Sequence, residues 1–383
     1  MLSCTSLAMA TSALVGVVLA PEPTLATLPL GLAYFGIMLT MMPASHLMKR
    51  YGRRTGFALG GTAGFFGGST SAIAIYLDSF VLFCVGSALF GIASGFAQFY
   101  RFAAAEMVEE SYKSRAISWV LAGGLIAAFV GPNVASFSRD MIEGAVFSAS
   151  YGFIAVFCFG VIVIQLFIRI PMPSSEETHG HKRPLALILK QPTFLVAALC
   201  AMIAYGSMNL LMTATPLAMH HREMAFSATA IVIQWHIVGM FAPSFFTGNL
   251  IHRFGVLKIM FIGAMLLIGC AIVALSGQLY AHFLTGLILL GIGWNFLYIG
   301  GTTLLTEVYQ PAEKATVQGI NEFLVFSATA LTAFSSGYLH HRLGWEKLNY
   351  YTLPMIGFAA VIILLLGWQL RHRQSLSAAV TES

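Results

Sequence analysis

Long hydrophobic runs, separated by short charged or turn-forming segments, recur along the whole chain. A hydrocarbon core of roughly 30 Å is crossed by about 20 apolar residues in a helix, so each run is long enough to predict one membrane-spanning helix. The twelve predicted spans cover residues 3–20, 26–47, 56–77, 79–104, 116–137, 146–169, 192–215, 227–247, 256–277, 280–304, 318–338 and 349–370. The expected fold class is therefore an all-α integral membrane protein.

Charge is scarce and lies almost entirely between these runs. Of the 383 residues, 58% are hydrophobic and only 9% are charged, which is outside the range of soluble globular proteins. The net charge of +5 would suggest nucleic acid in a soluble protein, but here lysines and arginines collect in alternate predicted loops, the positive-inside pattern. We therefore expect a multi-pass inner-membrane protein, surrounded by membrane lipid, with both termini cytoplasmic and no nucleic-acid partner. The loops expected outside contain only four basic residues: Arg139, Arg222, Arg342 and Lys347.

Several classes of function find no support in the motifs. The five cysteines are isolated within hydrophobic runs and form no CxxC pair, so we expect neither disulfides nor a metal site, and no cofactor. No phosphate-binding loop, HExxH helix or GxSxG elbow occurs, which argues against an ATPase and against a hydrolase. The chain is not expected to be an enzyme.

Two segments recur at a nearly constant offset. The basic segment Ser45–Gly56 matches Gly248–Lys258 at an offset of 203, and GIASGF at Gly91–Phe96 matches GIGWNF at Gly291–Phe296 at an offset of 200. Repeated halves are common in secondary transporters, whose substrate site lies near the membrane midplane between the repeats. The pattern predicts an N-terminal six-helix half at 1–170, a cytoplasmic linker at 171–191, a C-terminal half at 192–371 and a cytoplasmic tail at 372–383.

The basic segment after the second span resembles the signature of the major facilitator superfamily. That signature is Gly, three residues, Asp, Arg or Lys, any residue, Gly, Arg, and Arg or Lys; here Ser45 replaces the glycine and Lys49 the aspartate. The positions that match are Arg50, Gly52, Arg53 and Arg54. The resemblance implies twelve helices in two homologous six-helix bundles, an alternating-access transporter of a small-molecule substrate, and a monomer.

Two further resemblances bear on the cargo. Residues Leu304–Phe326 resemble a group of the superfamily associated with riboflavin uptake, which makes riboflavin import the leading hypothesis. The segment Gly123–Pro132, which ends in a Gly-Pro pair, resembles part of the antiporter motif, so proton-coupled efflux of drugs or metabolites is the alternative. A receptor or scaffold of the same ancestry, which would bind without transport, is a third class.

Polar and aromatic residues at mid-span are candidates for substrate contact. Aromatic walls with a few amides suit a planar organic molecule, although core packing is the alternative for each aromatic residue. His236 could carry a coupling proton, or could be a neutral, packed histidine. The candidate substrate-binding residues are Gln98, Arg101, Tyr205, Asn209, Gln234, Trp235, His236, Trp294 and Asn295.

Charged residues at helix ends are candidates for a gate. In the superfamily the aspartate slot faces the N-terminus of the eleventh span, and Lys49 there would be repelled by the positive end of that helix. We therefore expect Lys49 or Arg50 to pair with Glu322; interaction with lipid headgroups is the alternative. Within each half, Arg53 or Arg54 would pair with Glu106, and Lys258 with Glu307. The candidate gating residues are Lys49, Arg50, Gly52, Arg53, Arg54, Glu106, Arg253, Lys258, Glu307 and Glu322.

Overall fold

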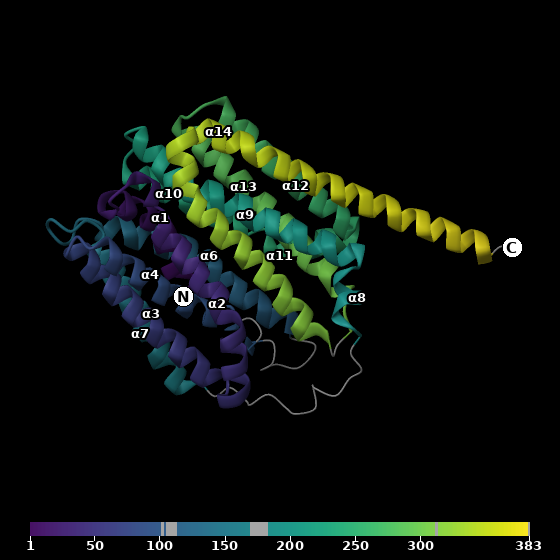
Figure 1. The fold of residues 1–383 in the computed structure, drawn as a ribbon, viewed down its shortest axis with the longest axis horizontal. Helices are drawn as coiled ribbons and strands as arrows, with labels where there is room; N and C mark the ends of the chain where they lie inside the picture. The colour runs from purple at the N-terminus through teal and green to yellow at the C-terminus, as the bar shows by residue number, and fades with distance from the viewer. Residues whose placement is uncertain (101–102, 105–112, 169–182, 311–312, 382–383) are drawn as a thin grey trace.

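A computed structural model describes residues 1–100, 103–104, 113–168, 183–310 and 313–381, and every regular element in these ranges is a helix (Figure 1). The first half contains α1 (Leu2–Leu19), the 3-10 helix η1 (Pro23–Leu25), α2 (Leu28–Tyr51), α3 (Arg53–Tyr76), α4 (Phe80–Ala97), α6 (Lys113–Ser138) and α7 (Ser148–Phe167). The second contains α8 (Leu185–Leu189), α9 (Pro192–His221), α10 (Phe226–Phe241), α11 (Ser244–Phe254), α12 (Val256–Ser276), α13 (Tyr280–Thr306) and α14 (Lys314–Thr381).

The helices follow the predicted spans, with three differences. The eighth span is two helices, α10 and α11, bent by 41° at a break that contains Pro243, because proline cannot donate the backbone hydrogen bond that would continue the helix. The eleventh and twelfth spans are joined in α14, where Gly344 has φ 76° and ψ 172° and separates two helical parts. The fourth span is interrupted: α4 ends at Ala97, a turn follows at residues 98–99, and the described residues 100 and 103–104 are helical again.

Length and hydropathy identify most of these helices as membrane spans. Among the described residues, eight helices are long and apolar enough to cross a membrane, or nine if α10 and α11 form one span. That number includes α14 once, although Gly344 divides it. The helix α3 falls outside the set because its many glycine, serine and threonine residues lower its mean hydropathy.

Packing contacts in the first half have counterparts in the second. The helix α2 packs on α4 as α10 packs on α13, and α3 packs on α4 as α12 packs on α13. In the same way, α3 contacts α7 as α12 contacts α14, and α1 contacts α6 as α9 contacts α14. The two bundles meet along two main helix pairs, α2 with α14 and α6 with α10 (Figure 1). We call this boundary the seam.

The two copies of the basic segment adopt the same backbone conformation. Gly52 joins α2 to α3 with φ 85° and ψ 156°, and Gly255 joins α11 to α12 with φ 88° and ψ 145°. Each glycine N–H donates to the carbonyl oxygen four residues earlier, at 2.9 Å for Met48 and 2.8 Å for Ile251. Only glycine adopts this positive φ without a steric penalty. The sequence repeat is therefore a structural repeat, and we call the end of the bundle that carries these two turns the basic end.

The second repeated segment brings helices into close contact. A Cβ atom at Gly91 would collide with the carbonyl oxygen of Ala33 in α2, and one at Gly291 would collide with the carbonyl oxygen of His236 in α10. Small residues at such positions let membrane helices approach closely. The recurrence of GIASGF as GIGWNF thus has a packing reason, because it permits the equivalent α2–α4 and α10–α13 contacts.

Candidate functional site

Four aromatic side chains from α9, α13 and α14 form what we call the central aromatic cluster: Tyr205, Trp294, Tyr298 and Phe326. The rings of Trp294 and Tyr298, one helical turn apart on α13, are stacked with their centroids 5.1 Å apart and their planes at 17°. The Tyr205 ring packs edge to face with both, at centroid distances of 5.1 Å and 4.8 Å, and its centroid lies 5.8 Å from that of Phe326. Two candidate residues, Tyr205 and Trp294, are therefore brought together by the fold.

A carboxylate adjoins this cluster. Glu322 lies one turn before Phe326 on α14, is half-buried, and accepts a hydrogen bond of 3.3 Å from the hydroxyl of Tyr298. The sequence predicts a gating role for Glu322, whereas it predicts substrate contact for Trp294 and Tyr205. The structure places these two groups of candidates next to each other.

The cluster lies at the seam. Phe326 belongs to a buried apolar group that includes Tyr34, Ile37 and Met41 of α2, so the α14 side of the cluster contacts the other half. The Ser327 hydroxyl lies 3.1 Å from the Met38 sulfur, which continues the same α2–α14 contact. A solute held against the cluster would therefore be sensitive to the relative position of the two halves.

Several buried polar atoms near the cluster lack hydrogen-bond partners in the described part of the chain. They include the indole nitrogen of Trp294 and the Oδ1 atom of Asn209, which follows Tyr205 by one turn. The Nδ2 atom of Asn209 does have a partner, because it donates a hydrogen bond of 3.0 Å to the carbonyl oxygen of Thr329. A buried polar group without a partner costs about 1–3 kcal/mol. A bound polar solute or a water molecule would remove that cost.

Both polar atoms of the Asn295 amide form hydrogen bonds with other residues of the chain. Its Nδ2 atom donates to the Met240 carbonyl oxygen and to the Ser244 hydroxyl, both at 2.7 Å, and its Oδ1 atom accepts from the Thr247 hydroxyl at 2.7 Å. These partners lie on both sides of the break between α10 and α11. Asn295 therefore joins α13 to the bent span.

The consecutive candidates Gln234, Trp235 and His236 face three different directions on α10. Gln234 accepts a hydrogen bond of 3.0 Å from the Asn133 side chain of α6, across the seam. Trp235 has 43% of its surface exposed. His236 is fully buried, and its Nδ1 donates to the Leu287 carbonyl oxygen at 2.8 Å, since a carbonyl can only accept. The three residues do not converge on one site.

Two candidates follow the end of α4 in the sequence. Gln98 is the half-buried residue that directly follows α4. Arg101, which the sequence places on the same predicted helix face, lies outside the described residues.

Two gating candidates, Arg50 and Arg253, occupy equivalent positions beside the two glycine turns and make equivalent contacts. The guanidinium carbon of Arg50 lies 5.2 Å from the centre of the Tyr51 ring, and that of Arg253 lies 5.3 Å from the centre of the Phe254 ring. Both arginines thus lie over the aromatic residue that follows them, immediately before Gly52 and Gly255. Both are cation–π contacts between solvent-exposed side chains.

The remaining gating candidates are only partly described. The side chain of Lys49 and all of Glu106 lie outside the described residues. Lys258 and Glu307 are both exposed, and no ion pair joins them in the described part of the chain. Arg53 and Arg54 open α3 directly after the Gly52 turn. The predicted pairings of Lys49 or Arg50 with Glu322, of Arg53 or Arg54 with Glu106, and of Lys258 with Glu307 therefore stay predictions.

An ion pair that sequence reasoning missed joins the linker to the α13–α14 junction. Arg183 donates through Nε to Oε1 of Glu313 at 2.9 Å and through Nη2 to Oε2 at 2.7 Å, and its backbone N–H adds a third bond at 2.8 Å. Only 2% of the Glu313 side chain is exposed. The Arg183 guanidinium lowers the pKa of Glu313 to about 2. No local pattern distinguishes this glutamate, because its partner is 130 residues away in a polar segment.

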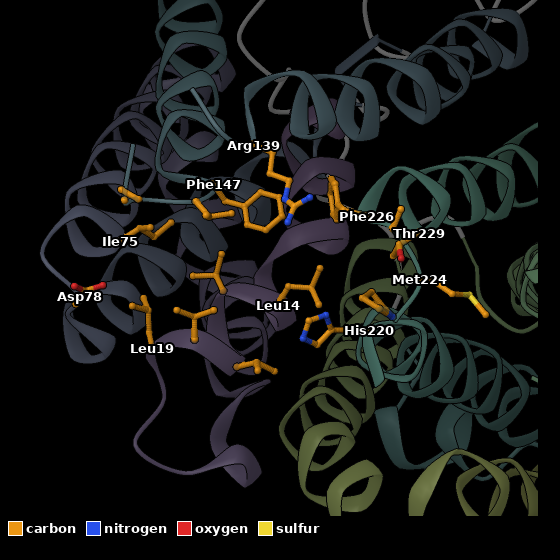
Figure 2. Close-up of a pocket in the computed structure, with 18 residues that line it drawn as sticks. Leu14, Leu19, Ile75, Asp78, Arg139, Phe147, His220, Met224, Phe226 and Thr229 are labelled. Carbon is orange, nitrogen blue, oxygen red and sulfur yellow. The ribbon is translucent and has the colours of Figure 1, made fainter. Parts of the chain in front are cut away.

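At the end opposite the basic end, a second aromatic group crosses the seam. Phe147, at the start of α7, and Phe226, at the start of α10, meet edge to face with ring centroids 4.8 Å apart. The Arg139 guanidinium carbon lies 5.8 Å and 5.7 Å from the centres of these rings. Figure 2 shows the three side chains together at the top of a cavity. Phe226 comes from the second half, so this contact joins the two halves at this end.

Comparison with known families decides the class of protein. The family model described as the Major Facilitator Superfamily matches residues 1–330 and also 197–382, so the matches together cover nearly the whole chain. The chain belongs to the major facilitator superfamily. This major facilitator protein is a multi-pass membrane transporter of a small-molecule substrate and not an enzyme, and the predicted fold of two six-helix bundles is confirmed.

Individual relatives agree with this assignment. The riboflavin transporter RfnT of Brucella anthropi is 40% identical over 354 residues, which cover 92% of this chain and 89% of the relative. The uncharacterized transporter YddS of Bacillus subtilis is 28% identical over 91% of this chain and 83% of its own length. The first relative confirms the resemblance to a riboflavin-uptake group.

Solved structures share the fold. A D-xylose–proton symporter has a TM-score of 0.73 at 15% identity, with 94% of each chain covered. A partially occluded, inward-open form of the xylose transporter XylE from E. coli has a TM-score of 0.71 at 12% identity, with 95% of each chain covered.

Proposed function

We propose that this major facilitator protein takes up riboflavin by alternating access. The observation that carries the proposal is the 40% identity, over nearly the full length of both chains, to a protein named as a riboflavin transporter. The central aromatic cluster supports it independently, because it offers stacked rings and unpartnered buried polar atoms at the seam. The flavin ring system is planar, carries carbonyl and ring-nitrogen acceptors for the Trp294 N–H, and has an imide N–H that can donate to Asn209 Oδ1.

Within this proposal the candidate residues have different roles. Tyr205 and Trp294 stack with the flavin ring, and Trp294 Nε1 and Asn209 Oδ1 supply a donor and an acceptor. Asn295 and His236 position helices, since their polar atoms bind α10, α11 and α13 to one another. Gln234 contributes to the seam through Asn133. No contact in the described part of the chain supports Gln98 or Trp235, and Arg101 lies outside the described residues.

The gate forms part of the same proposal. Lys49 or Arg50 pairs with Glu322 when the basic end is closed, and the pair separates when that end opens. The basic end faces the cytoplasm of a cell whose inner membrane holds the protein as a monomer, with both termini cytoplasmic.

The proposed domain boundaries follow the two bundles. We place the N-terminal half at 1–170, the cytoplasmic linker at 171–191, the C-terminal half at 192–371 and the tail at 372–383. The Arg183–Glu313 ion pair supports a linker that is attached to the second half at its C-terminal end.

Proton-coupled efflux is the second candidate function. It rests on the Gly-Pro pair of α6, where a Cβ at Gly131 would press against Ser3 and Ser6 of α1, and where the adjacent Asn133 contacts α10 across the seam. A closely packed α6 that contains a proline at the seam is a feature that restricts leakage in an exchanger.

Growth of a riboflavin-auxotrophic bacterium separates the two functions. We expect expression of this chain to restore growth on low riboflavin, and an uncoupler to abolish riboflavin accumulation. An exporter would instead lower the accumulation of fluorescent dyes and leave the growth requirement unchanged. Failure to restore growth, with the protein present in the membrane, would contradict uptake.

A further inference from the structure

A cavity of about 350 Å³ lies at the seam, at the end opposite the basic end (Figure 2). Its walls come from both halves: the last turns of α1, the α6–α7 connection, the end of α9 and the start of α10. Leu14 and Val15 of α1 contribute apolar surface, and Val17 and Val18 form part of an exposed margin, with 38% and 76% of their surfaces exposed. Its volume lies within the range of about 300–1,000 Å³ that small-molecule sites have.

The polar side chains that line this cavity are few. Arg139 lies among apolar walls, and its Nε atom is buried without a hydrogen bond in the described part of the chain, 3.7 Å from the Asp140 carboxylate. His220 and Thr229 add an imidazole and a hydroxyl, and Asp78 is the exposed acidic residue of the lining. A guanidinium flanked by two aromatic rings and apolar walls favours a flat, aromatic ligand that carries hydrogen-bond acceptors.

We propose that this cavity is an outer binding site, which holds a planar aromatic solute with acceptor groups before the solute reaches the central aromatic cluster. Arg139 determines its specificity by donating to an acceptor on the solute, and Phe147 and Phe226 provide aromatic edges for the ring. The inference rests on the proposed function, since uptake requires that the solute enter from this end. The cavity opens further as Phe226 moves away with the second half.

A cysteine-protection experiment tests the occupancy of this cavity directly. Val17→Cys is introduced into a chain whose half-buried Cys84 is replaced by serine; the other four cysteines are buried. Leu279→Cys is the control, because Leu279 is 69% exposed at the start of α13, away from the cavity lining. We expect riboflavin to slow maleimide labelling of Val17→Cys at least threefold and to leave labelling of Leu279→Cys unchanged.

Arg139→Gln then tests the specificity residue. We expect about a tenfold higher riboflavin concentration for half-maximal protection, because a hydrogen bond to a charged donor is lost. The matched control is Arg342→Gln, an exposed arginine whose guanidinium carbon lies 5.9 Å from the centre of the Tyr338 ring. It should leave protection unchanged.

The possible outcomes separate this inference from the proposed function. Uptake of riboflavin without protection of Val17→Cys would overturn the outer site and leave uptake standing. Protection without uptake would support the site and overturn riboflavin transport, and absence of both would overturn both. If Val17→Cys stays unreactive with and without riboflavin while Leu279→Cys reacts, lipid fills the cavity and the outer site is overturned.

Discussion

The Tyr298 hydroxyl donates a hydrogen bond of 3.3 Å to the carboxylate of Glu322, and thereby joins α13 to α14 within the central aromatic cluster. Tyr298 stacks on Trp294 on one side and reaches the proposed gating carboxylate on the other. A solute that displaces the Tyr298 ring would therefore disturb Glu322. In the proposed mechanism, this contact links solute binding to the closure of the basic end.

Tyr298→Phe tests that link, because it removes the hydroxyl and keeps the ring. We expect riboflavin affinity to change by less than about twofold, since stacking is retained, and the transport rate to fall several-fold. Binding is measured by flavin fluorescence and transport in proteoliposomes. A variant with wild-type transport would show that the hydrogen bond has no role in coupling.

Glu322→Gln tests the gate itself. The neutral amide cannot form the proposed ion pair with Lys49 or Arg50, so we expect the closed basic end to become less populated. Cysteines introduced at that end should then react faster with a maleimide, and transport should fall. Glu346→Gln is the control, because Glu346 is an exposed carboxylate of α14 that accepts a hydrogen bond from Gln278, away from the proposed gate. Unchanged reactivity and transport in Glu322→Gln would refute the pairing across the seam.

Trp294→Phe tests the stacking surface. We expect riboflavin affinity to fall by roughly two- to tenfold, because a smaller ring stacks less well and the unpartnered indole N–H is lost. Trp345→Phe is a closely matched control: Trp345 is also buried, packs 5.2 Å from Phe283, and has an unpartnered indole nitrogen, but it lies outside the cluster. Equal losses of affinity in the two variants would indicate a general packing effect.

The ion pair of Glu313 with Arg183 should stabilise the protein over a wide pH range. The pKa of Glu313 is lowered from 4.5 to about 2, so its contribution is fully present above about pH 4.5 and is lost as the pH falls through about 2. We expect Glu313→Gln to lower the Tm in detergent by several degrees between about pH 5 and 8, and the difference to shrink in stronger acid. This Tm difference is measured by thermal unfolding at each pH, with size-exclusion chromatography as the readout. A Tm difference that disappears already near pH 5 would contradict the lowered pKa of Glu313.

The internal repeat of the basic segment is the feature of the fold that is easiest to predict from the sequence. Gly52 and Gly255 occupy equivalent positions in the two copies of the basic segment, and both adopt the positive φ that such turns require. The bend at Pro243 escapes prediction, because a single hydrophobic run from 227 to 247 conceals it. Pro243 itself is visible in the sequence, but the side chain that bridges the break, Asn295, lies about 50 residues away in α13.

The candidate site is predictable in part. Tyr205 and Trp294 are recognisable as mid-span aromatic residues and do meet, but the stacking of Trp294 on Tyr298 depends on how α9, α13 and α14 pack. His236 and Asn295 are candidates because a buried polar side chain needs a partner, and each finds one within the chain. Sequence alone cannot distinguish a partner in a neighbouring helix from a partner in a bound solute.

The central claim is that this chain carries riboflavin across the membrane through the central aromatic cluster. Uptake of radiolabelled riboflavin into proteoliposomes that contain the purified protein tests it most directly, with protein-free liposomes and Trp294→Ala as references. We predict saturable uptake by the wild-type protein that unlabelled riboflavin competes away, and at least a tenfold loss of initial rate in Trp294→Ala. Uptake no greater than in protein-free liposomes would contradict the claim.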